Sequence, residues 1–242
     1  MEETQRLRTA LLASLGHDLR TPLTAIRGAA ETVRGSWGQL DEATRDDLLE
    51  SIEQDVARMA RFLSNITELT RLETGQISPH LVPVNVGEAV EAASGPMASS
   101  PFVAINIEDP EPVALADPVM LEQVLINVLE NAAKYSPSNS LIQVRGRRER
   151  QEVVLTIADE GIGIPPGDLP HVFDSFYRAK RGDRVAPGTG LGLAIARGLV
   201  EAMGGHIEAH SPRPDLPRDG APGTIVTIRL PATSFNTARS TA

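Results

Sequence analysis

A seam of apolar residues spaced like a coiled coil is the feature that most restricts how this chain can fold. Its members are four, three, four and three residues apart, which places them on one face of an α-helix. Such a helix is not stable alone in water, because the seam has to be covered by other apolar surface. The seam consists of Ile52, Val56, Met59, Leu63 and Ile66, and Leu49 and Phe62 widen it.

The first third of the chain is predicted to form a helical hairpin. Apolar residues from Leu7 to Val33 also recur at helical spacing, and residues 4–74 show no strand pattern. Two glycines at 35 and 38 interrupt the helical pattern, and Asp41 suits the N-cap of a second helix. Two helices alone bury only one stripe each. We therefore expect a second copy of the chain to complete a dimeric four-helix bundle.

After residue 76 the sequence alternates between β-rich runs and helical stretches. This alternation predicts an α/β sandwich, in which a layer of helices covers one sheet. Four prolines mark the connection between the last two strands. The expected strands are 81–86, 102–107, 141–144, 153–158, 206–210 and 224–230, and the expected helices are 86–98, 118–134 and 191–203.

Composition narrows the possible functions. The 242 residues carry a formal net charge of −9, and aromatic residues make up 3%. Both values argue against nucleic-acid binding, which uses positive potential and aromatic stacking. The chain has no cysteine, which excludes thiolate metal sites and cysteine nucleophiles. No run approaches the roughly 20 apolar residues of a membrane span, so we expect a soluble, intracellular protein.

The first chemical motif surrounds His17 and Asp18 on the first predicted helix. A neutral imidazole is a nucleophile, and its reference pKa of about 6.5 leaves a neutral fraction near pH 7. The neighbouring carboxylate could accept the ring N–H and so strengthen the nucleophile. A solvated histidine on a charged helix face explains this motif equally well.

The second motif lies on the helix expected over 118–134, which Asp117 would cap. Asn127 and Asn131 are four residues apart, and Lys134 follows three residues later, so the three share one face. Amide oxygens are hard ligands, and two amides with a cation suit a site for Mg²⁺ and phosphate. A solvated polar face is the alternative.

Two glycine-rich motifs complete the set. Asp159 opens the run 159–165 directly after a predicted strand, where its carboxylate could accept a hydrogen bond from an amine such as that of adenine. The run 188–195 opens a helix whose free N–H groups could bind phosphate, but it lacks the third glycine of a dinucleotide fingerprint. Basic residues over 178–184 could steady phosphates as part of a lid, although a solvated loop has the same composition.

In this order the motifs resemble the H, N, G1 and G2 boxes of bacterial sensor histidine kinases, and residues 173–178 resemble their F box. The resemblance covers about residues 4–232. More narrowly, residues 11–24, 124–132 and 185–188 look like those of the KdpD-type potassium sensors. Gly16 departs from the usual serine, which costs helix propensity but removes no group that phosphorylation needs.

The resemblance implies a role for each matching residue. His17 would receive the γ-phosphoryl group of ATP, Asp18 would orient or deprotonate it, and Thr21 would align water in a phosphatase reaction. Asn131 would hold Mg²⁺, assisted by Asn127, which stands where related ATPases carry a glutamate base. The residues implied around the nucleotide are Asn127, Asn131, Lys134, Tyr135, Asp159, Gly161, Gly163, Arg178, Gly188, Gly190, Gly192, Leu193 and Thr224.

The resemblance also implies an organisation and partners. A dimerisation and phosphoacceptor domain would span 1–74, a linker 75–80, a GHKL-type ATP-binding domain 81–232 and a disordered tail 233–242. The implied partners are a second copy and a response-regulator receiver domain, KdpE-like in the narrower reading, with no nucleic acid. The chain would be the cytoplasmic portion of an inner-membrane sensor, reaching the membrane only through segments outside it.

Two other functions stay open at this point. One is a non-catalytic dimerisation scaffold with a degenerate nucleotide site, against which the intact Asn127, Asn131 and Asp159 argue. The other is a protein-serine kinase of the same ATPase superfamily that inhibits a sigma factor. The hairpin that carries His17 argues against that second alternative.

Overall fold

The computed structural model describes residues 20–95, 102–108, 110–178, 189–215 and 221–233. The chain forms two compact units, Met1–Glu68 and Leu69–Ala242. None of the described helices is both long enough and apolar enough to cross a membrane.

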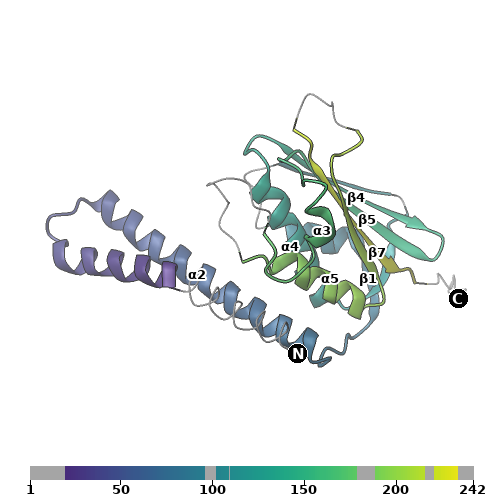
Figure 1. Ribbon diagram of the computed structural model, residues 1–242, viewed down its shortest axis with the longest axis horizontal. Coiled ribbons are helices and arrows are strands. Elements are labelled where there is room, and N and C mark those ends of the chain that lie inside the picture. The colour runs from purple at the N-terminus through teal and green to yellow at the C-terminus, as the bar shows by residue number, and fades with distance from the viewer. Residues whose placement is uncertain (1–19, 96–101, 109, 179–188, 216–220, 234–242) are drawn as a thin grey trace, which may run out of the picture. The chain divides into compact units, whose positions relative to one another are not determined.

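The described part of the first unit is a helical hairpin. Residues 20–36 are helical, and the chain turns back into the long helix α2 (Glu42–Glu73), as Figure 1 shows. The Oδ1 atom of Asp41 accepts a hydrogen bond from the Thr44 N–H at 2.7 Å, which confirms the predicted cap. The guanidinium of Arg45 closes the turn, since it donates to the Leu40 carbonyl and lies 4.9 Å from the centre of the Trp37 ring.

The second unit is an α/β sandwich. Its main sheet has the strand order β2-β4-β5-β7-β6, with β2 and β4 parallel and the other pairs antiparallel. Strands β1 and β3 form a separate antiparallel pair. The elements are β1 (Val82–Asn85), α3 (Val86–Ser94), β2 (Phe102–Ile107), β3 (Val113–Ala116), α4 (Pro118–Tyr135), β4 (Leu141–Glu149), β5 (Glu152–Asp159), the 3₁₀ helix η2 (Leu169–His171), α5 (Gly192–Ala202), β6 (His206–His210) and β7 (Thr224–Pro231).

Helices α3, α4 and α5 form one layer against the main sheet (Figure 1). The core lies between these layers, where Leu125 and Leu129 of α4, Ile195 of α5 and Leu155 of β5 are fully buried. Burying a leucine side chain contributes about 1.5–3 kcal/mol, so this interface is the main source of the unit's stability. The predicted order of a helical hairpin followed by an α/β sandwich is confirmed.

The ends of several elements differ from the sequence prediction. Strand β3 was not predicted, because it is a four-residue segment that contains two alanines, which disfavour strands. Strand β4 continues five residues past Val144, since its charged second half pairs with β5 in an antiparallel hairpin. Helix α3 ends at Ser94 instead of residue 98, with Gly95 at its C-cap.

Asp117 joins the segment before β1 to helix α4. Its Oδ1 accepts the Val119 and Met120 N–H groups at 3.0 and 3.2 Å. Its Oδ2 accepts the His80 N–H at 2.9 Å. Partial burial favours the neutral acid, but the backbone donors outweigh this effect and hold the pKa of Asp117 below its ordinary 3.8.

Replacing Asp117 by alanine should destabilise the second unit by about 1–2 kcal/mol, because the helix loses its N-cap. The matched control Glu122→Ala removes an exposed acid from the same helix and should change stability by less than about 0.5 kcal/mol. Because the folded-state pKa of Asp117 is depressed, its stabilisation is present above pH 3.8 and disappears as the pH falls through the folded-state value. Urea unfolding of both variants at neutral pH measures the difference, and equal losses would contradict the capping role.

Candidate nucleotide site

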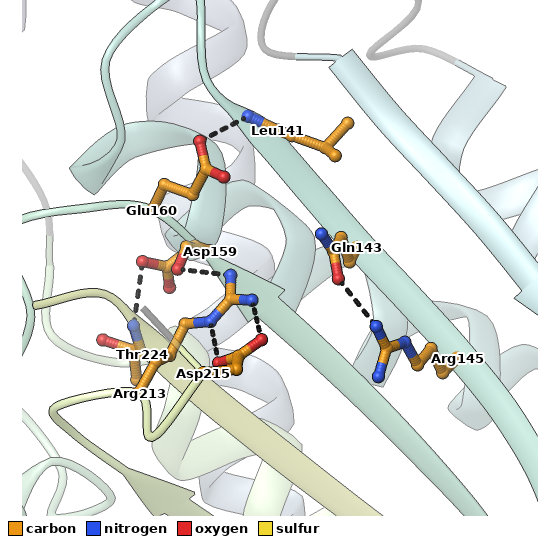
Figure 2. A network of polar contacts seen from close by, with 8 residues as sticks. All are labelled: Leu141, Gln143, Arg145, Asp159, Glu160, Arg213, Asp215 and Thr224. Carbon is orange, nitrogen blue, oxygen red and sulfur yellow. Dashed lines mark hydrogen bonds and ion pairs between the residues drawn. The ribbon is translucent and has the colours of Figure 1, made fainter. Parts of the chain in front are cut away.

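Residues of the three predicted nucleotide motifs meet where secondary-structure elements end or begin. Asp159 is the last residue of β5, Thr224 is the first of β7 and Tyr135 is the last of α4. Strands β5 and β7 pair with Asp159 opposite Thr224. Segments separated by more than 60 residues thus form one small polar region (Figure 2).

Asp159 is the buried acid of this region, with 7% of its surface exposed. Its Oδ1 accepts the Gly161 N–H at 2.8 Å and the Thr224 N–H at 3.2 Å. Burial raises the pKa of Asp159 above its ordinary 3.8, opposed by these two hydrogen bonds and by the charge of Arg213. The carboxylate is therefore held in place and has acceptor capacity left for a ligand's N–H group.

The turn after Asp159 is packed so tightly that it requires glycine. A Cβ atom on Gly161 would lie 2.5 Å from the Tyr135 carbonyl oxygen and 2.8 Å from Oδ1 of Asp159. That same carbonyl accepts the Ile162 N–H at 3.2 Å, which ties the turn to the end of α4. Gly163 follows with φ +64°, a conformation that favours glycine.

Asn127 is buried, and its amide nitrogen lacks a hydrogen-bond partner among the described residues. The residue is 7% exposed, and its Oδ1 accepts a weak bond from Gln123 at 3.4 Å, while its Nδ2 has no partner within the described structure. A Cβ atom on Gly192, the first residue of α5, would lie 3.6 Å from Oδ1 of the same amide. Leaving a buried amide unsatisfied costs about 1–3 kcal/mol, so this side chain fits a site that a polar ligand completes.

The other predicted residues of α4 lie at its C-terminal end. Asn131 is half-buried, one turn after Asn127. The Nζ of Lys134 donates to the Tyr135 hydroxyl at 3.0 Å and lies 4.6 Å from the centre of that ring. Both of these side chains are exposed, so the ammonium is accessible to an anionic ligand.

The F-box-like segment contacts the second glycine motif. The Phe176 N–H donates to the Gly190 carbonyl at 2.9 Å, and Phe176 has the unusual φ of +66°. Gly190 has φ +69°, and a Cβ there would lie 2.7 Å from the Tyr177 carbonyl oxygen. A hydrogen bond to Asp168 raises the pKa of Tyr177 and holds this segment to η2. Residues 176–177 and Gly190 therefore contact each other directly.

Among the described nucleotide residues, the structure joins Tyr135, Asp159, Gly161 and Thr224 in one group and places Asn127 near Gly192 in another. Leu193 is half-buried in α5, and Arg178 is exposed beside the lid-like connection. Thr21 is exposed on the helix 20–36 of the other unit. His17, Asp18 and Gly188, and the expected tail beyond Thr233, lie outside the described residues.

Sequence reasoning missed the buried Arg213. Its side chain is 1% exposed and donates to the Asp159 carbonyl oxygen at 3.0 Å. It lies in the connection between β6 and β7, which the sequence marks only as a proline-rich loop. An arginine between two prolines gives no signal of burial, because arginine is usually exposed.

Two family models match the chain. The model described as "Histidine kinase-, DNA gyrase B-, and HSP90-like ATPase" covers residues 116–234, and the "His Kinase A (phospho-acceptor) domain" covers residues 7–75. The first match identifies the second unit as an ATP-binding domain. Its range includes all of the nucleotide residues described above.

Individual proteins agree with these matches. The sensor protein KdpD of Clostridium acetobutylicum is 36% identical over 238 residues, which are 95% of this chain and 25% of KdpD. This chain thus spans about a quarter of that relative's length. The solved structure of the mycobacterial sensor histidine kinase MprB is 30% identical, with a TM-score of 0.56, and the match covers 63% of this chain and 97% of the chain in that structure.

A third comparison shows the same fold over nearly the whole chain. The histidine kinase ThkA, solved in complex with the response regulator protein TrrA, has a TM-score of 0.65 at 21% identity, and covers 96% of this chain and 65% of that one. The phosphoacceptor and ATPase models occur in the order that the hairpin and sandwich require. The chain belongs to the sensor histidine kinases and is similar to their KdpD-like transmitter regions, with a phosphoacceptor region followed by an ATPase region.

Proposed function

We propose that this protein transfers the γ-phosphoryl group of Mg-ATP to His17 and then to an aspartate of a response regulator. The observation that carries the proposal is the buried Asn127 amide with its unmade hydrogen bond, in the unit that also holds the buried acceptor Asp159. A polar ligand would satisfy the first group, and an amine would satisfy the second. ATP supplies both kinds of group.

In the proposed complex Asp159 accepts a hydrogen bond from the adenine amine. Gly161 and Gly163 give the turn its close packing beside the base, and Thr224 holds the carboxylate from β7. Lys134 approaches the phosphates, with Tyr135 beside the nucleoside. The resemblance assigns the phosphate side and the lid to Arg178, Gly188, Gly190, Gly192 and Leu193, of which Gly188 lies outside the described residues.

Asn131, assisted by Asn127, would hold the Mg²⁺ ion. The fit to Mg²⁺ rests on the hard amide oxygens of the two residues, whereas the unpartnered Nδ2 of Asn127 is a donor that suits a phosphate oxygen. A Mg²⁺ ion held there would supply neutralisation of the phosphate charge during transfer. An amide cannot act as a general base, so Asn127 should not activate water, and ATP hydrolysis should remain slow.

The phosphoryl transfer needs mainly positioning. A ring nitrogen of neutral His17 forms the new N–P bond, the bond from the γ-phosphorus to its bridging oxygen breaks, and ADP leaves. Asp18 fixes the tautomer and takes up the ring proton. The phosphoryl group then passes from the imidazole to a receiver carboxylate. In a separate phosphatase reaction, Thr21 would align a water molecule that hydrolyses the aspartyl phosphate of the regulator and releases inorganic phosphate.

The proposed form is a homodimer that binds a receiver domain on the helical bundle. Leu49, which widens the seam, and the seam residues Val56 and Leu63 recur every seven residues and are 42%, 51% and 53% exposed in the single chain. A second hairpin would cover them. The similarity to KdpD and to a kinase solved with its response regulator supports a KdpE-like partner and potassium signalling from a membrane-attached protein.

Incubation with γ-labelled ATP and Mg²⁺ tests the proposal, with His17→Gln compared against the intact chain. We expect acid-labile, base-stable label that disappears in this variant. The control His206→Gln removes an exposed histidine of β6 and should keep its label. Label that survives in His17→Gln would overturn the assignment of the acceptor, and ATP binding without any label would favour the scaffold alternative.

A further inference from the structure

The connection between β6 and β7 is bonded to the turn that follows Asp159. The Ser211 hydroxyl accepts the Ile164 N–H at 2.8 Å and donates to the Gly223 carbonyl at 2.7 Å. The Gly223 N–H donates to the Gly161 carbonyl at 2.9 Å. The Arg213 N–H closes the connection on itself by donating to the Pro222 carbonyl at 2.7 Å. The turn therefore depends on residues about 50 positions later in the chain.

Arg213 is the charged group of this connection (Figure 2). Its Nη1 donates to the Asp159 carbonyl oxygen at 3.0 Å. Its Nε and Nη2 donate to the two carboxylate oxygens of Asp215 at 3.0 and 2.6 Å, a bidentate pair. The arginine side chain is 1% exposed, whereas that of Asp215 is 49% exposed. Asp215 thus fixes the guanidinium, and the guanidinium fixes the end of β5.

The position of this cation matters for the protonation state of Asp159. The guanidinium interacts with Asp159, Asp215 and Glu160. Burial favours the neutral form of Asp159 and raises its pKa, while the hydrogen bonds from the Gly161 and Thr224 N–H groups, and after them the positive charge of Arg213, favour the ionised form. An ionised carboxylate only accepts hydrogen bonds, whereas a protonated one also donates.

The two forms would recognise different bases. Adenine carries an amine at the position where guanine and hypoxanthine carry a carbonyl oxygen. An acceptor-only carboxylate bonds the amine and repels the carbonyl, while a protonated acid could donate to that carbonyl. Selectivity for adenine therefore requires that Asp159 stay ionised.

We propose that Arg213 is a positioning residue for Asp159, which fixes the end of β5 so that the carboxylate can accept from the adenine amine, and so selects adenine over 6-oxopurine nucleotides. The inference rests on the proposed function, in which Asp159 receives the adenine amine. Asp215 supports it by holding the guanidinium. Neither residue touches the nucleotide in this scheme.

Titration calorimetry of the full chain with Mg-ATP and with Mg-GTP, repeated over a series of pH values, tests the role. Arg213→Met should lower ATP affinity by about tenfold or more, while the weak GTP affinity stays within about twofold. Removal of the positive charge should also raise the pH at which ATP affinity begins to fall on acidification. The ionisation of ATP itself is common to all variants and cancels in the comparison.

Three further variants distinguish a positioning role of Arg213 from a general loss of folded structure. Arg213→Lys keeps the charge and should restore the pH profile of ATP binding with part of the affinity. Asp215→Asn leaves Arg213 in place and should lower ATP affinity by about threefold, which keeps the test decisive if Arg213→Met does not fold. The control Arg229→Met removes an arginine that pairs with Glu149 and Glu152 near the β4–β5 hairpin, and nucleotide binding should not change.

The outcomes are distinguishable. Affinities for ATP and GTP that fall by the same factor, with an unshifted pH profile, would reduce Arg213 to a structural residue. Unchanged ATP binding in both Arg213→Met and Asp215→Asn would also overturn the inference. An intact chain that binds neither nucleotide would instead refute the proposed nucleotide site itself.

Discussion

Replacing Gly161 by alanine is expected to lower ATP affinity about 100-fold. The new Cβ would lie 2.5 Å from the Tyr135 carbonyl oxygen and 2.8 Å from Oδ1 of Asp159. Neither atom belongs to a flexible side-chain end, because one is backbone and the other already accepts two N–H groups. Overpacking of this kind costs about 1–3 kcal/mol, and each 1.4 kcal/mol corresponds to about tenfold in affinity. The turn must move, and the carboxylate moves with it.

Gly167→Ala is the matched control for this prediction. A Cβ on Gly167 meets no other atom within 4 Å, so the same chemical change should leave nucleotide binding intact. Calorimetry gives the two affinities, and circular dichroism shows whether each variant is folded. A Gly161→Ala protein that binds ATP as tightly as Gly167→Ala would show that the turn is looser than its geometry indicates.

Replacing Leu63 by glutamate is expected to weaken the proposed dimer by about 100-fold or more. The side chain is 53% exposed in the single chain and lies seven residues after Val56 on the seam. Burying a leucine contributes about 1.5–3 kcal/mol, and in a symmetric dimer each substitution acts twice. The carboxylate would also have to be desolvated in the bundle.

Ala57→Glu introduces the same charge elsewhere on α2. Ala57 is exposed and lies off the seam, one residue after Val56. Analytical ultracentrifugation across a concentration series should show a dimer for this control and a monomer for Leu63→Glu. If both variants and the unmodified chain sediment as monomers at micromolar concentration, the proposed dimer is wrong.

The fold could be predicted because its strongest signals are local. Asp117 and Pro118 mark the start of α4, and the apolar spacing along that helix identifies its buried face. The regular seam of α2 identifies the hairpin in the same way. In these segments local propensity and final packing agree, so the periodicity alone predicts the element.

The buried contacts of Arg213 that support the site could not be predicted, because they are not local. Arg213 is buried only because a carbonyl and a carboxylate meet it in three dimensions. Its sequence neighbours describe a loop, and no periodic pattern links it to Asp159. Strand β3 was missed similarly, since its pairing with β1 lies outside any local pattern. Long-range polar contacts are thus the part that sequence reading leaves out.

The position of β7 in the main sheet has a consequence for synthesis of the protein. Strand β7 is the last in sequence, yet it lies between β5 and β6. Until it leaves the ribosome, β6 has no neighbour in the sheet, and Asp159 lacks the Thr224 N–H that is 65 residues away. A contact between residues so far apart in the sequence costs chain entropy to form, and it therefore forms slowly. A nascent chain therefore completes the polar region around Asp159 only when β7 is inserted.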